Sequence, residues 1–398
     1  MKKIIDLNRI KKASQYLSQS TEIMRNTFLK NLCRELEMKR ESIIIANIID
    51  IKNAQNDHLA DSFVERLTLD EKVINTLVNK VKKILKLDSD IGKVLDQRVG
   101  DDGILIKKIG VPIGVVAVIY EARPEVTIDV AALCIKSGNS AILKGGTEAM
   151  NTNKILYKCI ENALLKSRLP KEAIGIITTK NRNVVDYLLK QHEYIDLVIA
   201  RGGYGLVNHV INNSTIPVLA HGAGGARIFI DESADFTMVE KIVVNAKTSK
   251  PAACNSLNTI LIHQKISARI LKRLKKILQD QGIEIIENDW TTEFLDLRIS
   301  MKIVKNVDDA IRFVNRYGKK HTEGIIADDK KVIDKFVKQV DAAAIFVNAS
   351  TRLHDGYVFG MGSEMGIATG KLHARGPVGL KDLTSYKWQI YGNGNIRK

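Results

Sequence analysis

The 398-residue sequence predicts an α/β protein with two domains, each built on a parallel sheet. Short unbroken apolar runs alternate with helical segments, which is typical of a parallel sheet covered by helices on both faces. The alternation stops near residues 220–230 and then begins again, which indicates a domain boundary there. The length and the 45% content of hydrophobic residues are sufficient for roughly two to three domains with cores of their own.

The first ninety residues or so are expected to be helical. Apolar residues recur there at three- and four-residue spacing, most clearly in segments 35–47 and 71–85. From Val99 to Tyr120 the pattern changes to alternation and β-branched residues, and Asp-Asp-Gly at 101–103 is typical of a hairpin turn.

Two series of strands and helices follow. The first is expected to contain the helices 129–136 and 148–167 and the strands 115–120, 140–144, 173–178 and 195–199. The second begins near Ala226 and is expected to contain the strands 227–230, 259–263, 323–327 and 344–347.

Glycine clusters stand at the ends of two expected strands, in Lys144-Gly145-Gly146 and 201–203, and at the domain boundary, in 221–225. Glycine lets the backbone approach a ligand closely, and the following helix offers its N–H groups to phosphate. No Gly-x-Gly-x-x-Gly motif follows the first expected strand of the series, so the common dinucleotide fingerprint is missing. A single cluster is more typical of an ordinary turn, but two clusters beside a basic residue favour a phosphate-bearing cofactor.

Cys254 is the candidate nucleophile. It lies on a short connection between an expected helix around 239–246, with Ser233 or Asp235 as N-cap, and the strand 259–263. Pro251, Ala252 and Ala253 are small neighbours, and Lys247 and Lys250 favour the reactive thiolate. A lone cysteine on a loop is nevertheless more often inert.

The other cysteines, Cys33, Cys134 and Cys159, fall in helical segments and are expected to be buried. The four cysteines lie far apart without metal-ligand spacing, so we expect neither a disulfide framework nor a metal site. We expect the protein to lie in a reducing cytoplasm. We also expect neither a signal peptide nor a membrane span.

The net charge of +16 comes from 61 basic and 45 acidic residues. Such a charge suits nucleic acid or an anionic small substrate. The lysines are spread along the whole chain instead of being gathered in one arm, which disfavours nucleic acid without excluding it.

Four long segments carry a family resemblance: 118–146, which includes Ala122-Arg123-Pro124, then 243–255 around Cys254, 347–352 (VNASTR) and 362–377. They closely resemble γ-glutamyl phosphate reductases, also called glutamate-5-semialdehyde dehydrogenases, a family within the aldehyde dehydrogenase superfamily. The similarity continues in the same order over nearly the whole chain.

The resemblance implies NADPH-dependent reduction of L-glutamyl 5-phosphate, a small-molecule acyl phosphate, to L-glutamate 5-semialdehyde in proline biosynthesis. It implies an aldehyde dehydrogenase-like fold, with N-terminal helices and a cofactor-binding domain in 1–225, a catalytic domain in 226–360 and a return segment in 361–398. The hairpin 99–108 and a C-terminal strand near 388–391 would form an oligomerisation element in a homo-oligomer. A glutamate kinase is the implied supplier of substrate.

The resemblance also implies roles for individual residues, with Cys254 as the catalytic nucleophile. The implied cofactor contacts are Arg123, Pro124, Lys144, Gly145, Gly146, Arg201, Gly202, Gly203 and Glu293. The candidate substrate contacts are His221, Asn255, Arg352 and Arg375. By their chemistry, Arg123 could grip phosphate with its planar fork, and Lys144 would favour the 2′-phosphate of NADPH.

Thiol chemistry agrees with this assignment. A thiolate can displace phosphate from an acyl phosphate to give a thioester, and hydride then reduces the thioester to the aldehyde. Oxidising aldehyde dehydrogenases use a glutamate to activate water for thioester hydrolysis, and segment 218–225 contains no carboxylate.

The chain departs from the family pattern at two places near the domain boundary. Ala220-His221 stands where the family usually has Glu-Thr, and Ala226-Arg227 where it usually has Cys-His. A paralogue that reduces a related acyl phosphate, an aldehyde dehydrogenase that releases free acid, and a basic nucleic-acid-binding protein without enzymatic activity stay open as alternatives.

Overall fold

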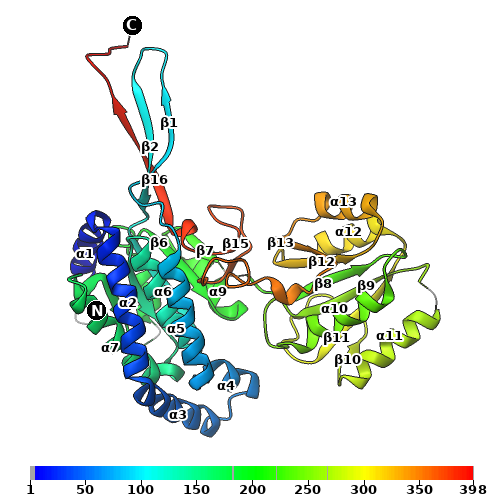
Figure 1. Ribbon diagram of the computed structural model, residues 1–398. Coiled ribbons are helices and arrows are strands. Elements are labelled where there is room, and N and C mark those ends of the chain that lie inside the picture. The colour runs from blue at the N-terminus through cyan, green and yellow to red at the C-terminus, as the bar shows by residue number, and fades with distance from the viewer. Residues whose placement is uncertain (1–4, 182, 221, 267, 398) are drawn as a thin grey trace. The chain divides into compact units, whose positions relative to one another are not determined.

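The computed structural model describes residues 5–181, 183–220, 222–266 and 268–397, and the chain divides into two compact units (Figure 1). Unit 1 comprises Met1–Ala220, Gly360–Gly366 and Val378–Lys398. Unit 2 comprises His221–Phe359 and Ile367–Pro377.

Unit 1 contains a five-stranded parallel sheet. Its strands are β3 (Val115–Tyr120), β4 (Ser140–Lys144), β5 (Ile174–Ile176), β6 (Leu197–Arg201) and β7 (Val218–Ala220). Their order is β5-β4-β3-β6-β7, so the chain builds outward from β3 in one direction and then in the other. This reversal beside β3 is the point where ligands bind in open α/β sheets, at the carboxyl ends of the strands.

Nine helices of unit 1 lie within the described residues. They are α1 (Leu7–Gln19), α2 (Glu22–Met38), α3 (Arg40–Asn56), α4 (Asp61–Leu67), α5 (Glu71–Lys86), α6 (Glu125–Lys136), α7 (Met150–Lys166), α8 (Asn183–Leu188) and α9 (Tyr204–Asn213). Helix α6 is buried from Val126 to Lys136, because α2, α5 and α7 pack around it. The N-terminal helices therefore serve to cover the first helix of the sheet.

A second sheet of unit 1 is antiparallel and consists of β1 (Val94–Val99), β2 (Leu105–Pro112) and β16 (Thr384–Tyr391), with β2 in the centre. Figure 1 shows it as a narrow ribbon. The hairpin expected at 101–103 and the C-terminal strand expected near 388–391 are therefore confirmed, and they pair in one small sheet.

Unit 2 contains a six-stranded parallel sheet of order β10-β11-β9-β8-β12-β13. The strands are β8 (Ala226–Ile230), β9 (Leu257–His263), β10 (Glu284–Ile286), β11 (Arg298–Val304), β12 (Thr322–Ile326) and β13 (Ala344–Val347). Helices α10 (Phe236–Thr248) and α11 (Ala268–Asp280) pack against the face that carries Ile228 and Ile260. Helices α12 (Val307–Tyr317) and α13 (Lys330–Gln339) pack against the face that carries Phe229 and Leu261, as the two-residue period of a strand requires.

Short elements complete the two units. They are the 3₁₀ helices Thr147–Ala149, Lys171–Ala173, Thr351–Leu353 and Lys381–Leu383, and the strands β14 (Ile367–Ala368) and β15 (Gly376–Pro377). No helix in the described ranges is long and apolar enough to cross a membrane.

The structure extends some expected elements and adds others. Helix α6 begins at Glu125, earlier than the expected start at Asp129, because Pro124 serves as its N-cap. Strands β7, β10 and β11 were not expected from the sequence. Both β7 and β10 have only three residues, and β11 carries charges at Arg298 and Lys302 that hide its apolar pattern.

Candidate active site

Cys254 lies on the turn between α10 and β9, at the amino edge of the unit 2 sheet. Helix α10 begins where the side chain of Asp235 accepts a hydrogen bond from the N–H of Thr237 at 2.9 Å, so Asp235, not Ser233, is the N-cap. The helix ends at Thr248, and hydrogen bonds from Ala253 to Lys250 and from Ser256 to Ala253 hold the turn. Cys254 is therefore held between two rigid elements, α10 and β9.

Cys254 is the accessible cysteine. It is partly exposed, whereas Cys33, Cys134 and Cys159 are buried as expected. Burial raises the pKa of Cys33 to about 11 and that of Cys159 to about 12, so these thiols stay protonated at neutral pH.

The glycines of segment 222–225 allow this segment to approach the backbone of Cys254. The N–H of Gly225 donates to the carbonyl of Cys254 at 2.6 Å. A Cβ atom on Gly224 would overlap that same carbonyl, and Gly225 has a φ of +94°, a region that L-residues rarely adopt. These two glycines therefore allow close packing against the turn that carries Cys254.

Arg352 binds the residue that follows Cys254. Burial lowers the pKa of Arg352, and Cys254 and Asp355 oppose that effect. Asn255 accepts a hydrogen bond from Arg352 Nη1 through Oδ1 and donates through Nδ2 to the carbonyl of His354 at 2.9 Å. The structure therefore brings together Cys254, Asn255 and Arg352, three of the residues that the sequence singled out.

Lys247, which the sequence placed near the thiol, interacts electrostatically with other charged groups. Its side chain is fully buried, and burial lowers its pKa to about 8, with Asp296 opposing and Arg298 adding to the effect. Lys250 is exposed. The expectation that these ammonium groups favour the thiolate stays a prediction.

A buried polar chain extends behind Asn255. His354 Nδ1 lies 2.8 Å from Thr322 Oγ1, which in turn lies 2.6 Å from Nδ1 of His321. Burial lowers the pKa of His321 to about 4, with the charge of Glu293 opposing, so His321 is neutral at pH 7. Sequence reasoning missed both histidines, because only the pairing of β12 with β13 brings 321–322 next to the segment after β13.

For Arg375, another of the candidate substrate residues, the structure gives no hydrogen bond with Cys254 within the described residues. Arg375 Nη1 lies 2.7 Å from Asp341, which also contacts Lys371 at 3.3 Å. These cations lower the pKa of Asp341, and the charge of Arg375 is thus shared with a neighbouring carboxylate. His221 lies outside the described residues.

A pocket of about 620 Å³ lies in unit 1 at the carboxyl ends of β3 and β4. Its volume is that of a typical small-molecule site. The residues that line it are Ile119, Tyr120, Glu121, Lys144, Gly145, Gly146, Thr147, Glu148, Lys180, Val185, Asp186, Leu206 and His209. Of the expected cofactor contacts, Lys144, Gly145 and Gly146 are among them.

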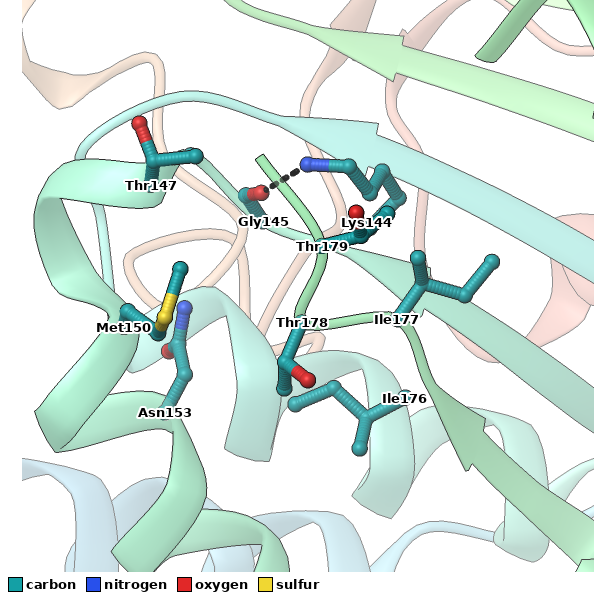
Figure 2. Close-up of a pocket in the computed structure, with 10 residues that line it drawn as sticks. Lys144, Gly145, Thr147, Met150, Asn153, Ile176, Ile177, Thr178 and Thr179 are labelled. Atoms are coloured by element: carbon teal, nitrogen blue, oxygen red, sulfur yellow. Dashed lines mark hydrogen bonds between the residues drawn. The ribbon is translucent and has the colours of Figure 1, made fainter. Parts of the chain in front are cut away.

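Figure 2 shows an adjoining small pocket in which Lys144 bends back over the strand end. Its Nζ donates to the carbonyl of Gly145 at 2.8 Å. Burial lowers the pKa of Lys144, and the carboxylate of Glu148 opposes this. A Cβ atom on Gly145 would come within 2.6 Å of the amide nitrogen of Asn153, so glycine is required for the close packing of this turn.

The turn Arg201-Gly202-Gly203 binds a carboxylate of the protein, the side chain of Glu121. The N–H of Gly203 donates to Glu121 Oε2 at 2.8 Å, and a Cβ atom on Gly202 would lie 2.6 Å from Glu121 Cδ. Among the described residues, neither this turn nor Arg123 and Pro124 line the pocket, although β3 and β6 are neighbours. Glu293 belongs to unit 2, where its charge acts on Arg227 and His321.

Sequence reasoning also missed a polar pair on the pocket wall. His209 Nε2 lies 2.6 Å from Asp186 Oδ1, and the two residues lie on α9 and α8, which follow β6 and β5. The usable signal was the strand alternation itself, because the helices that follow the strands of one parallel sheet begin at the same edge of that sheet.

Comparisons with known proteins give a consistent result. The aldehyde dehydrogenase family model matches residues 7–285. A gamma-glutamyl phosphate reductase from Carboxydothermus hydrogenoformans is 42% identical over 414 residues, covering 100% of both chains, and one from Clostridium tetani is 42% identical, covering 98% of this chain and 97% of its own.

Solved structures agree with the sequence relatives. The crystal structure of the gamma-glutamyl phosphate reductase from Thermotoga maritima superimposes with a TM-score of 0.94 at 38% identity, covering 98% of this chain and 99% of that one. An acetylating aldehyde dehydrogenase from Geobacillus thermoglucosidasius, at 18% identity and a TM-score of 0.74, covers 98% of this chain and shares the fold.

Proposed function

Because the chain belongs to the gamma-glutamyl phosphate reductase family within the aldehyde dehydrogenase superfamily, and is thus an oxidoreductase with a nicotinamide cofactor and a small-molecule substrate, we propose that it reduces L-glutamyl 5-phosphate with NADPH. The product is L-glutamate 5-semialdehyde, an intermediate of proline biosynthesis. The observation that carries this proposal is the accessible thiol of Cys254 beside Asn255, which binds the guanidinium of Arg352.

The first half of the reaction is acyl transfer to Cys254. The thiolate attacks the carbonyl carbon of the acyl phosphate, a C–S bond forms, the C–O bond to phosphate breaks, and inorganic phosphate leaves. Arg352 is suited to bind the departing phosphate, because its planar guanidinium can donate two hydrogen bonds to phosphate oxygens. A backbone N–H aimed at the developing oxyanion contributes roughly 2.7–4 kcal/mol to such a step.

The second half reduces the thioester. NADPH supplies the hydride when it is bound. The resulting thiohemiacetal collapses to the aldehyde, and Cys254 leaves as the thiolate, ready for another cycle. Since segment 218–225 carries no carboxylate to activate water, the thioester is expected to persist until the hydride arrives.

The residues of the unit 1 pocket fit a nucleotide cofactor. The pocket is large enough to hold a small molecule. Gly145 allows close packing at the end of β4, and Lys144 places a cation at the pocket wall. We assign the 2′-phosphate to Lys144 and retain Arg123, Pro124, Gly146, Arg201, Gly202, Gly203 and Glu293 as proposed contacts. Among the substrate contacts, Asn255 and Arg352 have structural support beside Cys254, whereas Arg375 and His221 rest on the resemblance.

The organisation of the whole protein is proposed on the same basis. Residues 1–225 would carry the cofactor, 226–360 the nucleophile, and 361–398 the return segment. The sheet of β1, β2 and β16 would join subunits of a homo-oligomer in the cytoplasm, with a glutamate kinase as the source of the labile acyl phosphate.

The test is an assay of the reverse reaction with glutamate semialdehyde, phosphate and NADP. Cys254→Ser is expected to abolish turnover, whereas Cys33→Ala, which changes a buried thiol of α2, is expected to keep it. Substantial activity of the serine variant would remove the covalent scheme. Oxidation that does not require phosphate would favour a free-acid dehydrogenase, and salt-sensitive nucleic-acid binding without cofactor binding would favour the non-enzymatic alternative.

A further inference from the structure

A buried charge pair lies at the amino ends of two neighbouring strands of unit 2. Arg227 of β8 and Glu323 of β12 are each about 1% exposed, and Nη1 of Arg227 lies 3.6 Å from Oε1 of Glu323. The backbone N–H of Arg227 donates to Oε2 at 3.1 Å. Burial raises the pKa of Glu323 to about 8, and Arg227 opposes this rise.

Such a pair is a costly way to fill a core. Removing a guanidinium from water is expensive, and apolar residues in place of such a buried pair often give equal or greater stability. Stability alone therefore gives a weak reason for Arg227 at this position.

The guanidinium has a second set of contacts that leads to the nucleophile. Nη1 donates to the carbonyl of Gly225 at 2.7 Å, and the N–H of the same Gly225 donates to the carbonyl of Cys254 at 2.6 Å. Both backbone polar groups of Gly225 are thus hydrogen-bonded, the carbonyl to Arg227 and the N–H to Cys254.

The other arm of the fork is anchored in the core of unit 2. Nη2 donates to the carbonyl of Trp290 at 3.2 Å, and the Trp290 ring packs edge-on against Phe313 of α12 at 5.4 Å. A fork that binds two carbonyls is specific to arginine.

We infer that Arg227 is a positioning residue for Cys254, which it holds in reactive geometry through Gly225. The inference rests on the proposed function, in which Cys254 is the nucleophile. Displacing a reacting group by about 1 Å can cost on the order of a hundredfold in rate, so a turn held by a rigid fork has catalytic value.

The experiment compares Arg227→Met and Arg227→Lys with the wild-type protein. Two rates are measured. The first is the rate at which iodoacetamide alkylates Cys254, monitored by mass spectrometry. The second is the rate of turnover with glutamyl phosphate. Arg227→Met is expected to slow both alkylation and kcat by about tenfold or more, with KM within about twofold. Arg227→Lys keeps the charge and one of the two carbonyl bonds, and is expected to recover part of both rates.

Lys136→Met is the matched control. Lys136 is a buried cation of unit 1 that binds Glu22 at 2.9 Å and Asn26 at 2.7 Å. Its replacement is expected to lower thermal stability without slowing alkylation of Cys254. The control separates a loss of stability from a loss of positioning.

Wild-type rates in folded Arg227→Met would overturn the inference. If that variant does not fold, Arg227→Lys decides, because wild-type alkylation and kcat in it would show that the fork is not needed. A wild-type protein inactive on glutamyl phosphate would contradict the proposed function, whereas the alkylation rates would still decide the role of Arg227.

Discussion

Arg352 and Asn255 lie beside the proposed nucleophile, Cys254. The amide of Asn255 accepts from the guanidinium and donates to the carbonyl of His354, so its orientation is fixed from two sides. A guanidinium held in this way suits a departing phosphate.

Replacing Arg352 tests this arrangement. Arg352→Gln is expected to lower kcat/KM for glutamyl phosphate by about a hundredfold, equal to about 2.7 kcal/mol of transition-state stabilisation. Arg312→Gln, in which an exposed arginine of α12 is changed, is the control and is expected to stay within about twofold. Steady-state kinetics of both variants provide the measurement, and equal values for the two would contradict a role for Arg352.

The sequence predicted Cys254, Asn255 and Arg352 because they lie in long family-like segments. It did not predict that Glu121 fills the turn at Gly203, because a carboxylate at the end of β3 carries no sign of its partner at the end of β6. The ordering of α10, the turn and β9 was predictable from the apolar pattern, since α10 is buried along one face and β9 along its whole length. Strands β10 and β11 were not, since their length and charges remove the strand signal.

At the level of elements, α10 ends in a buried cation. A lysine in the last turn of a helix is favourable for the helix dipole, but Lys247 Nζ has no hydrogen-bond partner among the described residues. Burial without a partner disfavours the charged form, which explains the lowered pKa of about 8.

The stability of the protein should therefore depend on pH through Lys247. Between about pH 8 and the ordinary lysine value of 10.5, the folded protein has lost the proton that the unfolded chain still binds, so the free energy of unfolding rises with pH. The rise is on the order of 3 kcal/mol. Lys247→Met is expected to remove it in urea unfolding series at several pH values.

Lys241→Met is the control for this measurement, because Lys241 is exposed on the same helix. It should retain the pH dependence of the wild-type protein. An unchanged slope in Lys247→Met would show that Lys247 is not the group responsible.

At the level of the whole molecule, the sheet of β1, β2 and β16 exposes a band of apolar and aromatic side chains. Val99, Trp388 and Ile390 are among them, and Ile390 is 61% exposed. Lys108 lies 3.8 Å from the ring centre of Tyr386, so cations and aromatic rings alternate on the sheet. A sheet that exposes this much apolar surface is typical of an interaction site.

Ile390→Lys is expected to shift the protein towards smaller species in light scattering while leaving its unfolding temperature as a dilute monomer unchanged. The side chain is exposed in the single chain, so the substitution removes no contact within it. Ile23→Lys, at an exposed position of α2, is the control and should not alter the mass. Identical masses for both variants would exclude this face of the sheet as a subunit contact.

The pairing of β16 with β2 has a consequence for biosynthesis. All of β2, from Leu105 to Pro112, pairs with residues that leave the ribosome hundreds of codons later. Contacts so distant in sequence form late, and the earlier segments can fold during translation. A nascent chain interrupted anywhere before Thr384 would lack β16 and would leave one edge of β2 unpaired, so truncated products would expose that edge to other chains.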